Sequence, residues 1–371
     1  MTGFTRRLLD VESTAPGDGT DGSHHIADDV SMLYLHIPFC KELCPFCSFN
    51  RTTFEETAAR RYYDGLRKEL AIYRDNGFSF STLYIGGGTP TVLPDELIGL
   101  IGHARELWPI KEISVETTPA DLEQNVIREL KTAGVNRLSI GVQSFEDGLL
   151  ESVNRIKKYG TGADIAAKLR DLGGFFDTLN VDLIFGLDGQ THDHVHRDIE
   201  IVKELEIDQV TCYPLMKKLE ESPTFTEWLP QMRWEKKAYR LIRETLLPDY
   251  QPSSAWCFSR GGGMIDEYIV EHPAYAGAGS GAFGYLNGNL VTNLFSLDEY
   301  MRKTDTGVRP TLFLRPFSPG EQLKYQLLMQ LFRGVVDFDS LRALNTSGFS
   351  WMLRGIEAGL RLFRSIERSG D

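Results

Sequence analysis

Three closely spaced cysteines constrain this sequence more than any other feature. Cys40, Cys44 and Cys47 lie in the run C-K-E-L-C-P-F-C. Thiolates at this C-x3-C-x2-C spacing are able to bind three irons of a [4Fe–4S] cube and leave the fourth iron open to a small chelating molecule. An open iron distinguishes a catalytic cluster from one that only carries electrons, so the run predicts a catalytic iron–sulfur site.

Other interpretations of the cysteines fit less well. A zinc site usually takes four ligands in two C-x2-C-type pairs, and this sequence has no second pair. Chance spacing is a poor explanation because the chain has only 5 cysteines in 371 residues. The two remaining cysteines, Cys212 and Cys257, are isolated, and we expect them to be buried and free.

The segment around the cysteines resembles a known family. The sequence L-Y-L-H-I-P-F-C-K-E-L-C-P-F-C-S-F (Leu33 to Phe49) is similar to the radical S-adenosylmethionine (SAM) enzymes around oxygen-independent coproporphyrinogen III oxidase. That branch also includes heme-chaperone relatives and class C radical SAM methyltransferases. The resemblance extends to about Tyr213, and more weakly to about Gly288. It implies that the open iron binds SAM, whose cleavage gives a 5'-deoxyadenosyl radical.

Composition argues against several other classes of protein. The net charge is −12, the pI is about 5.3 and no basic run stands out, so we expect no nucleic-acid partner. The mean hydropathy is −0.24 and no long apolar run exists, so we expect no membrane span. No signal peptide is evident, and clustered cysteines without a paired framework suit a reducing compartment. We therefore expect a cytoplasmic protein.

Short β-branched runs alternate with longer helical patterns from Ser31 onward. The predicted strands are Leu33–Ile37, Thr82–Ile85, Glu112–Glu116, Arg137–Gly141, Thr178–Ile184 and Gln209–Tyr213. The predicted helices are Glu56–Arg74, Pro94–Leu107, Gln124–Ala133, Thr161–Leu172, His192–Leu205, Trp234–Leu246, Gly320–Phe332 and Gly355–Ile366. This α/β alternation indicates a parallel sheet built from right-handed crossover units. It matches the partial (β/α)6 radical SAM barrel that the resemblance implies, with ligands at the carboxyl ends of the strands.

Changes in pattern suggest four regions. Residues 1–30 are rich in small and polar residues and are expected to form a flexible arm. Residues 31–250 are the predicted radical SAM barrel, and residues 251–318 are a glycine-rich extension near the active site. Residues 319–371 are expected to form a small, mainly helical C-terminal accessory domain that caps the open barrel.

Candidate ligand-binding motifs follow the predicted strands. The segment Y-I-G-G-G-T-P (Tyr84 to Pro90) follows the second strand, and its glycines let backbone N–H groups approach a polar ligand without obstruction by Cβ atoms. Glu116 ends the third strand, where its carboxylate could receive an ammonium group or a ribose hydroxyl. Without the resemblance, the glycine segment could equally be a simple turn, and Glu116 could be a surface glutamate. The resemblance implies that Gly87, Gly88 and Thr89 contact the amino-acid part of SAM.

The next three strands contribute further polar candidates. Gln143 ends the fourth strand and offers a neutral donor and acceptor for a ribose or a carboxylate. Arg155 could pair with the SAM carboxylate through its planar guanidinium. Asp182 interrupts the apolar fifth strand, and because a buried aspartate is costly unless paired, we interpret it as an acceptor for a ribose hydroxyl. Tyr213 and Pro214 end the sixth strand, near where adenine would lie.

Aromatic residues complete the candidate site. We expect Tyr34, His36 and Phe46, which lie before or among the cysteines in the sequence, to frame the cluster. In the coproporphyrinogen branch, a Tyr and a Phe matching Tyr34 and Phe46 help to hold two SAM molecules, which implies a second SAM here. Phe283 lies in a second glycine-rich run, Tyr275 to Gly288, which resembles a G-x-G-x-x-A segment near the family's active site. Phe283 is either a lid over SAM or a packed aromatic.

The resemblance leaves the reaction open. Coproporphyrinogen oxidases typically have a fourth cysteine where this chain has Phe49, and the H-N-x-x-Y-W stretch of the heme chaperones is not evident around Trp256. Our leading expectation is two-SAM, class C methyl or methylene transfer to a planar (hetero)aromatic or tetrapyrrole-like small molecule. The alternatives are coproporphyrinogen III decarboxylation, porphyrin ring opening, or a heme chaperone with a vestigial SAM core. We expect flavodoxin or ferredoxin as the electron donor.

Overall fold

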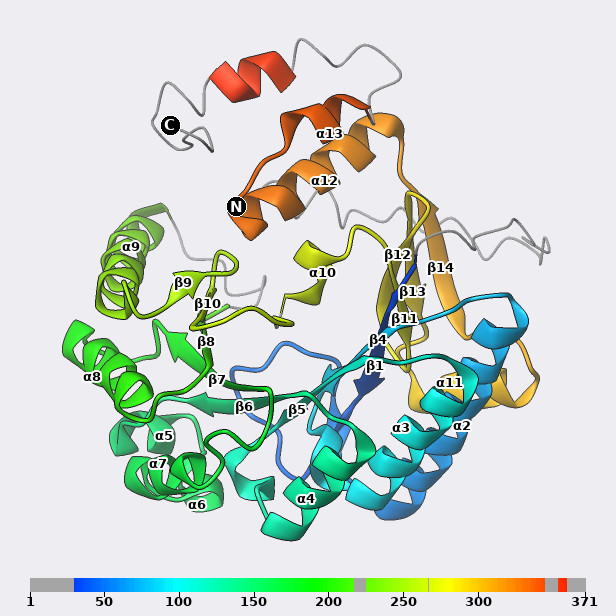
Figure 1. Ribbon diagram of the computed structural model, residues 1–371, viewed down its shortest axis with the longest axis horizontal. Coiled ribbons are helices and arrows are strands. Elements are labelled where there is room, and N and C mark those ends of the chain that lie inside the picture. Colours follow the sequence, from blue (N-terminus) through cyan, green and yellow to red (C-terminus); the bar gives the residue numbers. More distant parts are fainter. Residues whose placement is uncertain (1–29, 217–224, 266, 344–352, 359–371) are drawn as a thin grey trace.

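The computed structural model describes residues 30–216, 225–265, 267–343 and 353–358 (Figure 1). The flexible arm predicted for residues 1–30 lies outside these ranges except for Val30. Most of the helix predicted over Gly355–Ile366 also lies outside them. Among the described residues, no helix is both long and apolar enough to cross a membrane.

The predicted parallel sheet is confirmed, and each predicted strand is present within a few residues of its expected ends. The parallel strands are β1 (Met32–Ile37), β4 (Thr82–Gly87), β5 (Glu112–Thr117), β6 (Arg137–Gln143), β7 (Thr178–Phe185) and β8 (Gln209–Pro214). They neighbour one another in chain order. Their carboxyl ends therefore meet along one edge of the curved sheet, as the sequence predicted.

Helices connect these strands and cover the outer side of the sheet (Figure 1). They are α2 (Glu56–Asp75), α3 (Pro94–Leu107), α4 (Gln124–Ala133), α5 (Asp147–Ser152), α6 (Ile156–Tyr159), α7 (Gly162–Arg170), α8 (His192–Glu204) and α9 (Phe225–Leu246). Two of them start at capping boxes, with Thr161 before α7 and Thr191 before α8. In each, the threonine hydroxyl accepts a helix N–H that would otherwise lack a partner.

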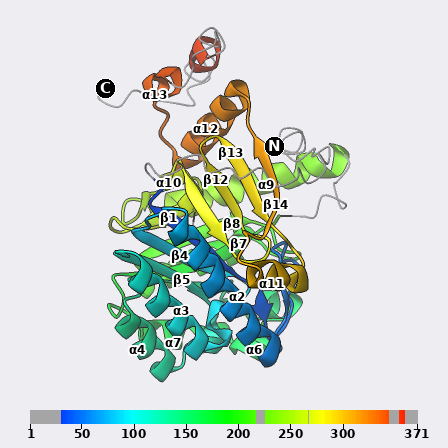
Figure 2. The ribbon, with the colours of Figure 1, turned by 90° about the vertical axis from the view of Figure 1, so that its right-hand side faces the viewer.

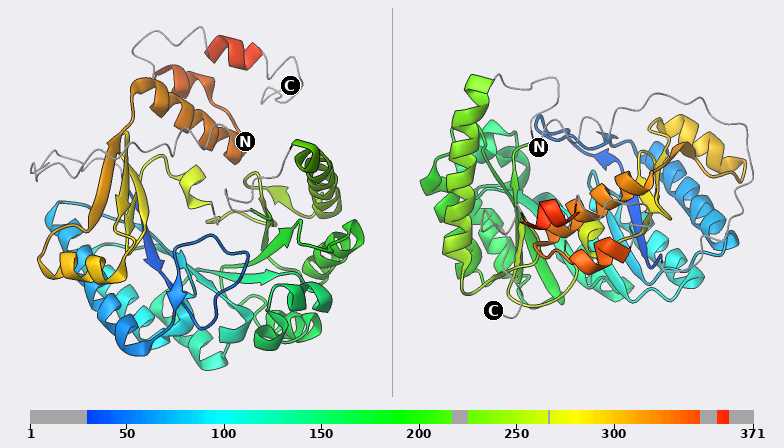
Figure 3. Two further views of the ribbon diagram at one scale, coloured as in Figure 1. Left: turned by 180° about the vertical axis from the view of Figure 1, so that it is seen from behind. Right: turned by 90° about the horizontal axis from the view of Figure 1, so that it is seen from above.

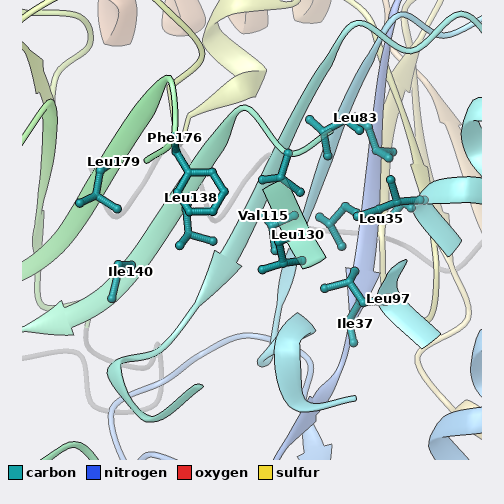
Figure 4. Packing of buried hydrophobic residues seen from close by; sticks show 14 of the residues in the cluster. Leu35, Ile37, Leu83, Leu97, Val115, Leu130, Leu138, Ile140, Phe176 and Leu179 are labelled. Atoms are coloured by element: carbon teal, nitrogen blue, oxygen red, sulfur yellow. The ribbon is translucent and has the colours of Figure 1, made fainter. Parts of the chain in front are cut away.

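The two faces of the parallel sheet differ in chemistry because successive side chains of a strand point to opposite sides. The outward side chains are apolar and pack against the helices. Figure 4 shows Leu35, Leu83 and Val115 of the sheet with Leu97 of α3 and Leu130 of α4. Each such side chain stabilises the fold by roughly 1.5–3 kcal/mol on burial. The inner face therefore need not supply the core, and it is free to carry polar groups.

The extension at residues 251–318 continues the same sheet, which the sequence pattern did not predict. Its strands are β9 (Gln251–Pro252), β10 (Cys257–Ser259), β11 (Tyr275–Ala278), β12 (Phe283–Leu286), β13 (Asn289–Asn293) and β14 (Thr311–Pro316). β11 joins β1 in parallel, and the others add antiparallel strands at both ends, giving a 12-stranded sheet with β14 and β9 at its edges. Since these edges do not pair, the barrel is open in the described part of the chain.

Helices α12 (Pro319–Arg333) and α13 (Phe338–Ala343) lie on the open side of the barrel, away from α2 to α8 (Figures 2 and 3). The described C-terminal region is thus helical, as predicted. A small separate core of Leu323, Phe338, Leu341 and Leu353 joins its helices. We keep the division into barrel, extension and accessory domain as a proposal, which this separate core supports for residues 319–371.

Glu69 of α2 is fully buried and connects the barrel to the extension. Its carboxylate accepts hydrogen bonds from the backbone N–H of Gly279 (2.8 Å), from Asn293 Nδ2 (2.7 Å) and from the Tyr300 hydroxyl (2.6 Å). Burial raises the pKa of Glu69, and these donors act in the opposite direction. A buried carboxylate with several donors is well satisfied, so it holds α2, β13 and α11 (Leu297–Asp305) together.

Replacing Glu69 with alanine should lower the free energy of unfolding by about 2–4 kcal/mol, because three buried donors lose their acceptor. Urea denaturation of the purified protein measures this change. Glu129→Ala removes an exposed carboxylate on α4 and should stay within about 0.5 kcal/mol of the parent. Equal stability of the two variants would contradict a fastening role for Glu69.

Candidate functional site

The cysteine loop begins and ends in a small parallel bridge. Cys40 ends β2 (Phe39–Cys40), which pairs with β3 (Thr52–Thr53). The backbone N–H of Phe54 donates to the Cys40 carbonyl at 2.8 Å. Cys40 is buried, Cys44 and Cys47 are half-buried, and all three are free. The bridge fixes the two ends of the loop so that its three thiols stay in one short segment.

Arg51 organises the loop from within, and sequence reasoning missed it. Its Nη2 donates to the backbone carbonyls of Cys44 (2.6 Å) and Cys47 (2.7 Å). The Cys47 N–H also donates to the Cys44 carbonyl at 3.3 Å. An arginine just after the last cysteine was visible in the sequence, but only the folded loop shows that it binds the cysteine carbonyls.

Two polar side chains lie beside the sulfurs. The Thr89 hydroxyl donates to Cys40 Sγ at 3.7 Å, and this contact lowers the pKa of a thiol that burial otherwise raises. Arg155 is 8% exposed, with its guanidinium 5.6 Å from the Phe46 ring centroid and 4.5 Å from that of Tyr159. Burial lowers the pKa of Arg155, and the cysteines oppose that shift. The three predicted residues Thr89, Phe46 and Arg155 are thus brought to the cysteines.

The Nε atom of Arg155 is buried and has no hydrogen-bond partner among the described residues. A buried, charged donor without a partner is unfavourable. Arg155 therefore has unused hydrogen-bonding capacity beside the cysteine sulfurs.

The glycine segment at the end of β4 is bound by acceptors within the protein. The N–H groups of Gly87, Gly88 and Thr89 donate to Glu116 Oε2 (3.0 Å) and to the carbonyls of Ile37 (2.7 Å) and Phe39 (2.8 Å). All three N–H groups therefore have protein acceptors, and contact of this segment with the amino-acid part of SAM stays a prediction. Glycine is needed for close packing instead. A Cβ at Gly87 would lie 2.6 Å from the His36 ring, and one at Gly88 would lie 2.6 Å from the Phe39 carbonyl oxygen.

Glu116 ends β5 beside this glycine segment and is half-buried. Besides the Gly87 N–H, its carboxylate accepts the Tyr84 hydroxyl at 3.0 Å. These two donors fix the orientation of the carboxylate at the carboxyl edge of the sheet. Tyr84, which sequence reasoning did not single out, therefore positions a predicted site residue.

Tyr34 and His36 form a hydrogen-bonded chain under the cysteine loop. The Tyr34 hydroxyl is 2.9 Å from His36 Nδ1, and His36 Nε2 is 2.7 Å from the backbone carbonyl of Asn50. Burial lowers the pKa of His36 to about 4. The ring is therefore neutral near pH 7, with a proton on Nε2 to donate to Asn50 and with Nδ1 as the acceptor. The two hydrogen bonds connect β1 to the residue before Arg51, and contact of Tyr34 and His36 with a cluster stays a prediction.

Gln143 and Asp182 lie on neighbouring strands at the same edge. Gln143 ends β6 with a φ of 76°, beside an irregularity in the pairing with β7. Asp182 is half-buried, not fully buried as the sequence suggested. Its carboxylate accepts Ser139 Oγ at 3.0 Å and Asn180 Nδ2 at 2.8 Å. These two neutral donors stabilise the Asp182 carboxylate, so the apolar strand β7 is able to contain it.

The remaining candidates lie farther from the cysteines along the chain. Tyr213 and Pro214 end β8 and are half-buried, with the Tyr213 ring 5.4 Å from that of Trp256. Phe283 begins β12, is 38% exposed and lies 6.3 Å from Phe295 between ring centroids. This packed pair matches the second of the two interpretations given for Phe283, and its role as a lid stays a prediction.

Cys212 and Cys257 are buried and neither forms a disulfide, as expected. They lie on β8 and β10, whereas the other three cysteines share one loop. In the described residues, no three His, Cys, Asp or Glu side chains converge closely enough to share a single metal ion. The thiolate ligands of a cube bind different irons, so they need not converge on one point.

Gly87→Ala should lower the free energy of unfolding by about 2–4 kcal/mol, because a φ of 115° excludes most side chains and the new methyl group would collide with His36. Gly102 is the matched control, since it lies inside α3 and an added Cβ would meet no atom within 4 Å. Gly102→Ala should stabilise the protein by about 0.5–1 kcal/mol. Thermal unfolding of the two variants and the parent protein measures these changes. An unchanged stability of Gly87→Ala would contradict the close packing around Gly87.

Comparison with known proteins identifies the family of this chain. The model of the Radical SAM superfamily matches residues 34–202. The heme chaperone HemW of Bacillus subtilis is 31% identical over 294 residues, which cover 73% of this chain and 75% of HemW. The oxygen-independent coproporphyrinogen III oxidase of Escherichia coli is 36% identical over 189 residues, covering 49% of this chain and 41% of the oxidase.

A solved structure shows the same fold. Coproporphyrinogen III oxidase (HemN) from Escherichia coli, described as a radical SAM enzyme, aligns with a TM-score of 0.72 at 22% identity. The alignment covers 91% of this chain and 83% of that one. The relatives are heme chaperones and coproporphyrinogen III oxidases, so they do not support our expectation of class C methyl transfer and fit its alternatives better. With a three-cysteine loop at the mouth of a parallel, open barrel, this chain belongs to the radical SAM superfamily, in the branch of HemW and HemN.

Proposed function

We propose that this chain is a SAM-cleaving radical enzyme whose substrate is a tetrapyrrole. Family membership implies a [4Fe–4S] cluster and SAM. The observation that carries SAM binding is the buried Arg155: its side chain has a hydrogen bond to Cys44, and its Nε has no partner among the described residues. A buried cation of this kind is costly unless an anion lies against it. The carboxylate of SAM is an anion of the right chemistry, and a planar guanidinium suits it.

The residues around the cysteine loop fit an iron–sulfur cube. Its ligands would be the thiolates of Cys40, Cys44 and Cys47, which are free. The Thr89 hydroxyl already donates to one of these sulfurs, and such a hydrogen bond favours the thiolate over the thiol. Arg51 holds the loop carbonyls in place. When bound, the cluster and SAM supply a primary carbon radical through one-electron cleavage of SAM.

The proposed SAM contacts come from the carboxyl ends of the strands. Glu116 and Asp182 would accept hydrogen bonds from the ammonium group or ribose hydroxyls, and Gln143 would serve as a neutral partner. Pro214 would pack against adenine. The full set of proposed contacts is Tyr34, Phe46, Gly87, Gly88, Thr89, Glu116, Gln143, Arg155, Asp182, Pro214 and Phe283. In this set the glycines shape the wall of the site, since their N–H groups are already used.

The rest of the barrel would protect the chemistry. A primary carbon radical abstracts hydrogen from most groups that it touches, so the site must exclude water and hold the target C–H bond in position. The barrel is open on one side, where α12 and α13 lie (Figure 3). We propose that this side admits the tetrapyrrole, and that an external carrier such as flavodoxin or ferredoxin supplies the electron. Binding of a second SAM stays part of the proposal.

The relatives support two fates for the tetrapyrrole. HemN-type decarboxylation of coproporphyrinogen III is the first candidate, because the polar groups that a SAM-cleaving site needs meet at the carboxyl edge of this barrel. Heme carriage is the second, because HemW is similar over 73% of this chain and Phe49 stands where the oxidases typically have a fourth cysteine. Methyl transfer remains as an outcome of the test below.

Changing Cys40, Cys44 or Cys47 singly to alanine should reduce the iron content of anaerobically reconstituted protein from about four per chain to nearly none. Iron analysis and the visible absorption of the cluster measure this loss. Cys212→Ala and Cys257→Ala are matched controls in the same chain and should retain the iron. Loss of iron in either control would mean that the cluster has a fourth cysteine ligand, and the open-iron proposal would fail.

Anaerobic incubation with SAM, dithionite and coproporphyrinogen III should yield 5'-deoxyadenosine together with decarboxylated porphyrinogen, both measured by mass spectrometry. With SAM deuterated in its methyl group, the deoxyadenosine should contain no deuterium, because hydrogen comes from the substrate. Deuterated deoxyadenosine with S-adenosylhomocysteine would indicate methyl transfer instead. Hemin binding without either product would favour the chaperone. Cys44→Ala is the control for background cleavage by dithionite.

A further inference from the structure

Gln143 has an unusual backbone for a side chain that must be held in place. Its φ of 76° lies in the left-handed region, which is unfavourable for residues other than glycine. The strain occurs where the pairing of β6 with β7 shifts register after Gly141. Such conformations persist only where the surrounding structure enforces them, and they cluster at functional sites.

Asp198 of α8 is hydrogen-bonded to the two residues that follow Gln143. Its carboxylate accepts the Ser144 hydroxyl at 2.8 Å and the backbone N–H of Phe145 at 2.7 Å. Asp198 is 2% exposed and Ser144 is 1% exposed. Burial raises the pKa of Asp198 to about 7 although both donors lower it. A carboxylate is therefore kept in the core at a cost in stability, with both of its oxygens bound to this turn.

Gly162 packs against the same turn. A Cβ at Gly162 would lie 1.7 Å from the carbonyl oxygen of Phe145, so the backbones touch directly. The Gly162 N–H is itself fixed by Asp147 Oδ1 at 2.8 Å. The turn thus contacts both α8 and the start of α7.

The strained backbone places the amide of Gln143 over Gly141. An added Cβ at Gly141 would lie 2.9 Å from Gln143 Nε2, and Gly141 is directly opposite Asp182 on β7. Residues opposite each other on neighbouring strands share a face of the sheet. The amide therefore lies on the face that carries the Asp182 carboxylate.

We propose that Asp198 is a positioning residue, which holds Gln143 in the left-handed conformation and so keeps its amide beside Asp182 at the SAM site. The side-chain hydrogen bonds of Asp198 go to Ser144 and Phe145 and to none of the three cysteines of the loop. Asp198 acts through Ser144 and Phe145. This inference rests on the proposed role of Gln143 in SAM binding, but the conformation of Gln143 is measurable without SAM.

The first test is the crystal structure of Asp198→Ala beside that of the parent protein. Residue 143 should return to a negative φ, with its amide away from Gly141. Ile199→Ala is the matched control, because Ile199 is the next residue on α8, is 1% exposed and packs in the apolar core. It should destabilise the protein and leave φ at residue 143 positive. A positive φ in Asp198→Ala would overturn the proposal.

The second test measures SAM affinity of cluster-loaded protein by equilibrium dialysis, with iron content and thermal unfolding recorded in parallel. Asp198→Ala should bind SAM about tenfold more weakly at unchanged iron content. Ile199→Ala should bind SAM like the parent despite its lower unfolding temperature. Asp198→Asn should recover most of the affinity, because its amide still accepts the Phe145 N–H and can donate to Ser144. Equal losses in Asp198→Ala and Ile199→Ala would reduce Asp198 to a stability role.

A double-mutant cycle then shows whether Asp198 acts through Gln143. Adding Asp198→Ala to Gln143→Ala should weaken SAM binding no further, because residues that act through one another are not additive. Additive losses would contradict the proposal. If Gln143→Ala alone binds SAM normally, the proposed contact between Gln143 and SAM is wrong. The φ of residue 143 in the crystal structure of Asp198→Ala then still decides whether Asp198 positions Gln143. Should Asp198→Ala fail to fold, Ser144→Ala is the substitute, because it removes one of the two hydrogen bonds of Asp198. It should weaken SAM binding in the same direction by a smaller factor.

Discussion

The alternation of side chains along the parallel strands is the constraint on which the rest of this structure depends. Register between neighbouring strands, such as Leu83 opposite Ile113 and Leu138 opposite Leu179, places the apolar set on the outer face. There it packs against the helices and supplies most of the hydrophobic stabilisation. A slip of one residue would exchange the faces and put polar groups against the helices. The register therefore fixes both the core and the polar interior.

The polar interior is not uniform along the strands. Near their amino ends, Arg137 is 1% exposed and fully engaged, with Nε and Nη2 bound to Gln209 Oε1 (2.9 and 2.7 Å) and Nη1 bound to Ser114 Oγ (3.0 Å). Buried polar groups that find all their partners within the protein stabilise one arrangement. At the carboxyl edge, by contrast, Arg155 Nε has no hydrogen-bond partner in the described part of the chain, and Gln143 has a strained backbone. This contrast supports the proposal that a ligand binds at the carboxyl edge.

Close packing of backbone groups joins the separate parts of this edge. The glycines after β4 let that loop touch β1 and the start of the cysteine loop, and Gly279 allows the extension to approach His36, whose carbonyl oxygen would lie 2.6 Å from an added Cβ. Tyr62 then connects both sides, because its hydroxyl donates to the His36 carbonyl at 2.7 Å and accepts the Ser280 N–H at 2.8 Å. The cysteine loop, the first strand and the extension are consequently one packed unit, although they are distant in sequence.

The sequence by itself determined the features that depend on local pattern. The six parallel strands, the helices between them and the clustering of Cys40, Cys44 and Cys47 follow from residue periodicity and spacing, which do not need long-range information. The residues at the strand ends were predictable for a related reason, because parallel strands bring their carboxyl ends to one edge. The strands of the extension were missed because most of them are short, and because β10 and β11 are stabilised by pairing with β8 and β1, which are distant in sequence.

Only the tertiary structure decided how the individual groups are used. It assigned the N–H groups of Gly87, Gly88 and Thr89 to protein acceptors, left Asp182 half-buried between Ser139 and Asn180, and brought Arg51 and Arg155 to the cysteines. It also brought Asp198, which is distant in sequence, into hydrogen-bonding contact with the residues that follow Gln143. Hydrogen-bond partners of this kind depend on distance and angle in the folded chain, and residue type and spacing do not contain that information.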